Sequence, residues 1–282
     1  VRTMNMPMSK AEMRRLRLSS LLPGLPGQHE KKLAKSMVTP KRGYASELEN
    51  RWLQSATVLR LDNGVVARSW GDGPKVLLVH GWNARGTQLC SYIEPLVRRG
   101  YEVVAIDLPG HGDSAGKFLT PAKARDALVA VGEQLGPLHS VVAHGYGAGA
   151  ALWAMATRLE VSKLVVLAGW SHYLWREYAA MAQLSKRSLN LLEHQLEKVF
   201  KHSPRLVSVE SFAAKIDKPV LLLHGKAESA VGHERAVRNL TLLRTAKLKL
   251  LDGLNDMDLL FEPIAVDAVM RFVTEEHEAV AA

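Results

Sequence analysis

Cysteine is nearly absent from the sequence: Cys90 is the only one in 282 residues. A single cysteine excludes an intramolecular disulfide and is typical of proteins from a reducing compartment. It lies in the helical pattern TQLCSYIEPL, where a buried small apolar side chain is expected rather than a catalytic thiol. The sequence therefore predicts a cytoplasmic protein without a reactive cysteine.

Long hydrophobic runs are missing as well. No apolar stretch approaches the roughly 20 residues that a membrane-spanning helix needs. The N-terminal stretch LRLSSLLPGLPG is interrupted by prolines and glycines between residues 23 and 27, before the apolar region of a signal peptide is complete. The overall composition, 47% hydrophobic and 23% charged, is that of a globular protein. We therefore expect neither a transmembrane segment nor a secretory signal.

Acidic residues are scarce at the start of the chain. Residues 1–42 contain ten Lys or Arg and two Glu, whereas residues 43–282 contain 27 basic and 26 acidic residues. The net charge of +9 therefore belongs to the N-terminal segment. Such a tail attracts acidic partners, anionic surfaces or nucleic acid. It lacks aromatic residues before Tyr44 that would stack on bases, and no DNA-binding motif is present, so no specific nucleic-acid recognition is predicted.

Metal-ligand spacings are also lacking. No pair of His, Cys, Asp or Glu follows the H-x-x-x-H or C-x-x-C pattern. The sequence thus predicts neither a metal nor another cofactor, and it gives no indication of the oligomeric state.

What the sequence does contain is an alternation of apolar stretches and helical patterns. The predicted strands are 75–80, 102–106, 140–143, 163–168, 219–224 and 247–251; the predicted helices are 86–99, 121–135, 148–158, 233–243 and 262–273. This alternation predicts an α/β fold with a mostly parallel sheet covered by helices on both faces. The tripeptide Asp62-Asn63-Gly64 between two β-rich segments predicts a leading hairpin.

Two further regions stand outside this alternation. We predict that residues 1–50 form a basic, partly disordered extension that contacts an acidic partner or an anionic surface. Residues 51–282 form the folded domain. Within it, residues 170–217 have long side chains and no strand pattern, which predicts a helical lid over the carboxyl ends of the strands.

Five stretches carry a resemblance to a known family. They are VLLVHGW (76–82), VVAIDLPGHGDSAG (103–116), AHGYGAG (143–149), PVLLLHG (219–225) and LLDGLNDMDLLFEP (250–263). In this order and spacing the chain resembles the α/β-hydrolase superfamily over roughly residues 56–276, most of all bacterial single-domain ester hydrolases with a short helical lid. The resemblance implies the α/β-hydrolase fold: a mostly parallel twisted sheet with helices on both faces.

The chemistry of that family needs a nucleophile at the strand–helix elbow, an acid after the next-to-last strand and a histidine after the last strand. The residues of this sequence that match these positions are Gly145, Glu228 and Asp256. Glutamate serves as an acid, but glycine has no nucleophilic atom. A carboxylate, with its usual pKa of about 4, is a poor base for a hydroxyl group. The resemblance therefore predicts a degenerate catalytic triad.

The resemblance also implies that other parts of the site persist. The backbone N–H groups of Trp82, which follows His80-Gly81, and of Tyr146 match the oxyanion-hole donors of the family. The candidate ligand-binding residues are therefore those beside these donors and at the start of the predicted lid: His80, Gly81, Trp82, Tyr146, Trp170 and Ser171.

Some polar residues near the sheet edge are candidates to replace the lost chemistry. Ser171 and His172 are the rescue candidates, although neighbouring residues rarely present their side chains to each other. His144 precedes the elbow, and strand alternation is expected to turn it away from the pocket, where it would be a buried, hydrogen-bonded histidine.

Three hypotheses remain open. In the first, which we favour, the protein is non-hydrolytic and binds a small carbonyl or acyl ligand, or a partner, through the old pocket. In the second it is a carboxylic-ester or thioester hydrolase whose catalytic residues are rearranged, drawing on Ser171, Glu228 or Asp256. In the third, the basic tail and the lid form an interaction surface and the sheet is a scaffold.

Overall fold

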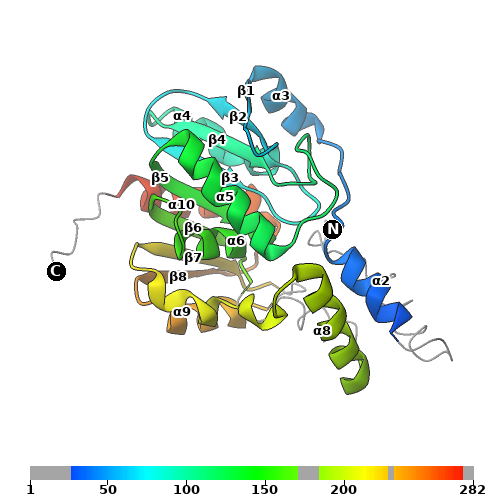
Figure 1. Ribbon diagram of the computed structural model, residues 1–282. Helices are drawn as coiled ribbons and strands as arrows, with labels where there is room; N and C mark the ends of the chain where they lie inside the picture. Colours follow the sequence, from blue (N-terminus) through cyan, green and yellow to red (C-terminus); the bar gives the residue numbers. More distant parts are fainter. Residues whose placement is uncertain (1–26, 171–183, 228–231, 276–282) are drawn as a thin grey trace.

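The computed structural model describes residues 27–170, 184–227 and 232–275. Its centre is one eight-stranded sheet of order β1-β2-β4-β3-β5-β6-β7-β8 (Figure 1). The strands are β1 (Thr57–Arg60), β2 (Val66–Trp70), β3 (Lys75–Val79), β4 (Glu102–Asp107), β5 (Leu138–His144), β6 (Val161–Leu167), β7 (Val220–Gly225) and β8 (Ala246–Leu251). Strands β3 to β8 are parallel, and β1 and β2 add an antiparallel edge. The predicted α/β fold is confirmed.

The predicted hairpin joins β1 to β2. Arg60 pairs with Val66, and Gly64, at φ +78°, donates its N–H to the carbonyl of Leu61. A positive φ at this turn is favourable only for glycine or asparagine, which explains the Asn-Gly signal.

Helices cover both faces of the sheet because odd and even residues of each strand point to opposite sides. On one face α5 (Pro121–Leu135), α6 (Gly145–Met155) and α9 (Glu234–Leu242) lie over a core that includes Leu77 and Val79. On the other face η1 (Gly86–Tyr92), α4 (Ile93–Val97) and α10 (Pro263–Thr274) lie over a core that includes Val76 and Leu78. The predicted helix at 86–99 is thus a 3₁₀ turn followed by a short α-helix.

Residues 27–50, part of the predicted extension, contain ordered elements. Helix α2 (Gln28–Ser36) is followed by α3 (Glu47–Ser55), which runs across the predicted boundary at residue 50. A capping box begins α3: the Glu49 N–H donates to Ser46 Oγ, and the Ser46 N–H donates to Glu49 Oε2 at 2.8 Å. The remainder of the predicted extension, residues 1–26, lies outside the described ranges, so partial disorder there stays a prediction.

The segment between α2 and α3 is fastened to the body. The Arg42 guanidinium donates to the carbonyls of Gly112, Ser114 (2.6 Å) and Gly116 (3.1 Å) in the loop after β4. The Lys41 N–H donates to Asn83 Oδ1 at 2.7 Å, in the loop after β3. The extension therefore crosses the two loops that follow the central strands.

The described part of the predicted lid, residues 184–217, is helical. It contains α8 (Lys186–Phe200) and the 3₁₀ turns η2 (Pro204–Leu206), η3 (Val209–Ser211) and η4 (Ala213–Lys215). One further 3₁₀ turn, η5 (Asp258–Leu260), follows β8. None of the helices described is long and apolar enough to cross a membrane.

Candidate functional site

The candidate site is built around the junction of β5 and α6. His144 is the last residue of the strand and Gly145 the first of the helix, so the chain reverses direction without a loop. Gly145 has φ +52°, a left-handed conformation that strains residues with a side chain. A Cβ atom at this position would meet only the Cα of Gly81, at 3.9 Å. The elbow is therefore sharp, with room for a side chain that glycine does not supply.

Two glycines in the first turns of α6 hold the elbow against its neighbours. A Cβ atom on Gly147 would overlap the carbonyl oxygen of His80 at the end of β3, and one on Gly149 would overlap the Trp170 ring. The Trp170 Nε1–H donates to the carbonyl of Tyr146 at 3.3 Å. Helix α6 thus begins earlier than the predicted residue 148, because these close contacts fix its first turn. Trp170, predicted to bind ligand, is buried against this helix.

Four of the predicted ligand-binding residues come together beside the elbow. The ring centroids of Trp82 and Tyr146 are 4.9 Å apart, and Trp82 also contacts His111 at 5.2 Å. Gly81 packs against the elbow: a Cβ on Gly81 would be 2.9 Å from His144 Nδ1, and a Cβ on Gly145 would be 3.9 Å from the Gly81 Cα. Residues 80–82 and the first turn of α6 therefore form one wall of the site.

His80 is engaged within this wall. Its Nδ1 donates to the carbonyl of Gly81 at 2.6 Å, and its Nε2 accepts from the N–H of Leu108 at 2.9 Å. Both contacts are satisfied only by the neutral ring. Burial is the main reason that the pKa of His80 falls to about 4, and burial together with His80 lowers the pKa of His111 to about 3. At neutral pH both rings are therefore uncharged, and they form hydrogen bonds with the backbone of the loops after β3 and β4.

Asp256 lies in the loop that follows β8. Its Oδ1 is 3.2 Å from Nε2 of His224, and both side chains are buried. His144 Nε2–H donates to the backbone carbonyl of Asp256 at 3.2 Å, and burial lowers the pKa of His144. The prediction of a buried, hydrogen-bonded His144 is confirmed.

Close approach of two chain segments brings this pair together. A Cβ on Gly225 would overlap the carbonyl of Leu254, and the Ala227 N–H donates to the same carbonyl at 2.9 Å. The loop after β8 therefore passes directly over the end of β7. Sequence reasoning missed His224; its only signal is a polar residue at the carboxyl end of the apolar stretch PVLLLHG.

Three predicted residues, Ser171, His172 and Glu228, lie outside the described residues, so their roles stay predictions. Within the described ranges no group of three His, Cys, Asp or Glu side chains has the arrangement of a metal site.

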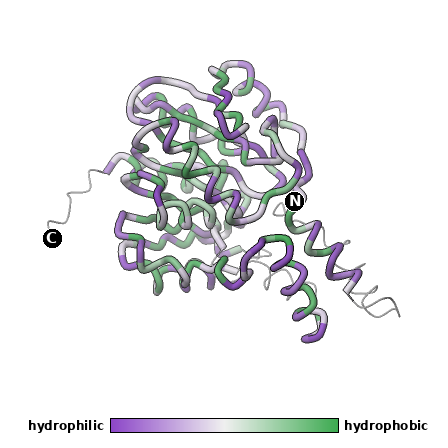
Figure 2. Tube along the Cα trace, viewed as in Figure 1, coloured by the Kyte–Doolittle hydropathy of each residue, from purple (hydrophilic) through white to green (hydrophobic). Residues whose placement is uncertain are grey.

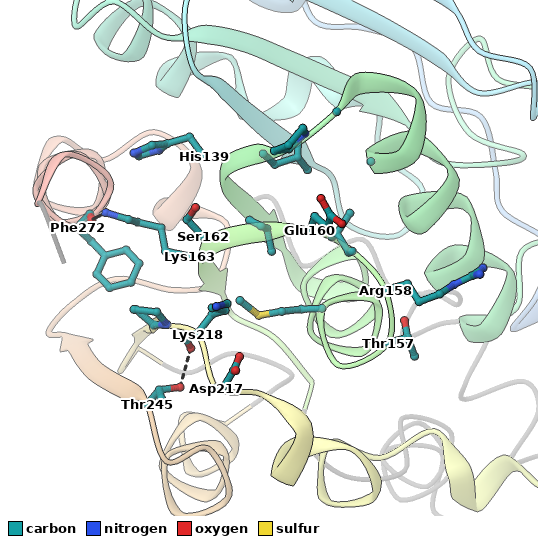
Figure 3. Close-up of a pocket in the computed structure, with 18 of the residues that line it drawn as sticks. His139, Thr157, Arg158, Glu160, Ser162, Lys163, Asp217, Lys218, Thr245 and Phe272 are labelled. Atoms are coloured by element: carbon teal, nitrogen blue, oxygen red, sulfur yellow. Dashed lines mark hydrogen bonds between the residues drawn. The ribbon is translucent and has the colours of Figure 1, made fainter. Parts of the chain in front are cut away.

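A separate groove of about 1850 Å³ lies at the opposite, amino-terminal edge of β5 to β8 (Figure 3). Its charged lining residues are of both signs, among them Glu160, Asp217 and Lys218. Lys163 donates through Nζ to the carbonyls of Phe272 (3.3 Å) and Val273 (3.2 Å) and so stabilises the carboxyl end of α10. The groove is remote from the elbow, at the other end of the parallel strands.

Comparison with known proteins agrees with this fold. A relative, the pimeloyl-[acyl-carrier protein] methyl ester esterase of Methylococcus capsulatus, is 41% identical over 51 residues, which is 18% of this chain and only 20% of that enzyme. An esterase from Pyrococcus furiosus superposes with a TM-score of 0.61 at 20% identity, over 84% of this chain and 97% of the other. An esterase from Exiguobacterium antarcticum gives 0.59 at 16% identity, over 78% and 99%. At such identities the structural likeness establishes the fold alone.

The family described as the alpha/beta hydrolase family matches residues 76–270, which is well over half of the sequence and runs from β3 into α10. The elbow at Gly145 and the loops after β3 and β8 all fall inside this match. This chain belongs to the α/β-hydrolase family.

Proposed function

We propose that this protein is a non-hydrolytic member of its family, which binds a small carbonyl or acyl ligand at the elbow. The observation that carries the proposal is Gly145: the sharp strand–helix turn is present, but its first residue has no side chain. Covalent catalysis at this place needs a hydroxyl, thiol or carboxylate group, and a glycine provides none.

The second support is the engagement of Asp256. Its carboxylate contacts the His224 ring at 3.2 Å in a fully buried setting. A carboxylate is a poor proton acceptor for a serine hydroxyl or for water. The loop after β8 therefore supplies an acid where the reaction of the family requires an imidazole.

The capacity to bind is retained. The elbow is the amino end of α6, where the peptide dipoles of the helix favour negative charge. The side chain of His144 does not cap this end of the helix. Together with the amide of Trp82, this end of the helix provides donors for a carbonyl or carboxylate oxygen. The neighbouring rings of Trp82 and Tyr146 suit the apolar part of such a ligand.

The test is an ester-hydrolysis assay on a panel of short and medium acyl esters. We expect the parent protein to be inactive. The variant Gly145→Ser/Asp256→His restores a hydroxyl and an imidazole but leaves that imidazole facing His224. A triple variant, Gly145→Ser/His224→Asp/Asp256→His, exchanges the pair and keeps an acid beside the new imidazole. We expect turnover from the triple variant, and less from the double variant.

Gly145→Ala is the matched control, because it adds a Cβ to the elbow without a hydroxyl. In parallel, the melting temperature of the parent protein in the presence of short-chain carboxylates measures ligand binding, since a ligand that binds only the folded state raises it. Ester turnover by the parent that disappears in Ser171→Ala or Glu228→Gln would refute the proposal in favour of a hydrolase with rearranged catalytic residues.

A further inference from the structure

Helices α2 and α8 form a pair, here called the two-helix arm and defined as residues 27–37 and 184–201. One helix comes from the N-terminal extension and the other from the insertion between β6 and β7, yet they lie side by side at one end of the molecule (Figure 1). Their apolar faces share a small core of their own, made by Leu33, Ala34, Met37, Leu192 and Leu196.

The exposed charged residues of the arm are almost all cationic. Glu197 is the only exposed acidic residue in the two described segments, because Glu30 is buried and Glu193 is paired with Arg205 at 2.6 Å. The exposed cations are Lys31, Lys32, Lys35, Lys186, Arg187, Lys198 and Lys201.

Helical periodicity explains this separation of charge from the apolar core. Along α2 the three lysines fall on the side opposite Leu33, and along α8 the cations fall on the side opposite Leu192, at 3.6 residues per turn. Figure 2 shows the resulting mixture of hydrophilic and hydrophobic positions along both helices. Each helix therefore turns a basic face outwards.

These cations also have no ion-pair partner among the described residues. Buried or half-buried arginines of the body, such as Arg68 and Arg85, are held by Asp107 and Asp113. By contrast, none of the seven exposed cations of the arm forms an ion pair with a residue that the structure describes. Their charges add up to a positive field around the arm, whereas residues 43–282 as a whole are nearly neutral.

We propose that the two-helix arm docks on an anionic phospholipid surface. Clusters of four to eight Lys and Arg on amphipathic helices attract acidic lipids, and each cation near such a surface contributes about 1 kcal/mol. Nucleic acid is the less suitable polyanion, because the exposed residues described in the arm include no Phe, Tyr or Trp for stacking on bases and only one arginine. The docking does not depend on the proposed ligand-binding function.

The experiment is co-sedimentation of the full chain with vesicles of phosphatidylcholine alone or of phosphatidylcholine with phosphatidylglycerol, at low and high salt. We expect binding only to the vesicles with phosphatidylglycerol, with loss at high salt. The charge reversal Lys31→Glu/Lys32→Glu/Lys35→Glu should lower the partition coefficient at least roughly tenfold. Lys186→Glu/Arg187→Glu/Lys198→Glu should do the same from the other helix.

The matched control is Lys215→Glu/Arg244→Glu/Lys249→Glu, which changes the net charge equally at exposed residues of the body. We expect it to reduce binding several-fold less than either arm variant. Melting curves check that each variant is folded, and the milder Lys31→Gln/Lys32→Gln/Lys35→Gln covers the case in which charge reversal unfolds α2.

Three outcomes would overturn the proposal. In the first, the arm variants bind vesicles as well as the parent does, which means that another segment of the chain carries the binding. In the second, the body control weakens binding as much as the arm variants, which makes net charge alone responsible. In the third, the parent ignores vesicles but binds a DNA duplex through the arm, which identifies a nucleic-acid surface instead.

Discussion

The Nε2 atom of His224 lies 3.2 Å from Oδ1 of Asp256, and water reaches neither side chain. His224 lies at the carboxyl end of β7, and Asp256 lies in the loop that follows β8. The pair therefore joins the end of β7 to the loop after β8, and its loss should affect the stability of this part of the sheet.

Replacing His224 by leucine should destabilise the protein strongly. The change leaves the Asp256 carboxylate buried without the ring that it contacts, and removing one partner of such a buried pair costs about 3–5 kcal/mol of unfolding free energy. Urea denaturation measures this difference. The control is Asp252→Asn, which removes an exposed pair with Lys226 and should cost about 1 kcal/mol or less. Equal small effects of both changes would show that the buried contact contributes nothing.

The glycines of α6 should differ in what they tolerate. Gly149→Ala places a methyl group inside the Trp170 ring, so α6 or Trp170 has to shift, at a cost of about 1–3 kcal/mol or more. Gly145→Ala has free space and bears only the strain of a left-handed residue, about 1–2 kcal/mol. Urea denaturation of the two variants compares these costs, and a larger loss at Gly145 would contradict the packing described.

Stability should fall as the solution becomes acidic. Burial lowers the pKa of His80 to about 4, below the usual value of 6.5, so the unfolded chain binds a proton more readily than the folded one. This contribution is complete above about pH 6.5 and is lost as the pH falls towards about 4, by an amount on the order of 3 kcal/mol. Urea denaturation across this range measures it.

The control for this pH dependence is His80→Gln, in which the titrating group is absent. The slope of unfolding free energy against pH between about 6.5 and about 4 should be shallower in this variant. An unchanged slope would mean that His80 titrates alike in the folded and unfolded chain.

Removing α2 should expose α8. Deletion of residues 1–37 takes away Leu33, Ala34 and Met37, which cover the apolar face of Leu192 and Leu196. We expect trypsin to cleave within 186–201 faster than in the full chain, because the helix loses its tertiary support. Deletion of residues 1–26 alone keeps α2 and is the control. Equal cleavage of both truncated proteins would contradict a supporting role for α2.

Much of the fold follows from local patterns. The apolar stretches of β3 to β8 and the helices between them predict a parallel sheet, since such strands are buried on both faces. Asn63-Gly64 predicts the hairpin, and Thr120 with Pro121 marks the start of α5, where the Lys123 N–H donates to Thr120 Oγ1 at 3.3 Å. These features were predictable because each depends on residues that are neighbours in the sequence.

The candidate site was predictable only in part. Motif positions identified Gly145, Asp256 and the wall that contains Trp82 and Tyr146. They did not reveal that His224 contacts Asp256, since a histidine at the end of a strand has no distinguishing local pattern. They also did not reveal that both ring nitrogens of His80 are used within the loops.

The sequence by itself determined that position 145 has no side chain, and that positive charge gathers near the N-terminus, because both are properties of the covalent chain. Tertiary structure alone decided that α2 packs on α8 and that Asp256 lies against His224. Pairings between such distant residues depend on which apolar faces are left uncovered and on how closely backbones approach at glycines such as Gly225. The uncovered apolar faces and the closeness of the backbones both depend on how all the elements pack together, so neighbouring residues in the sequence do not determine them.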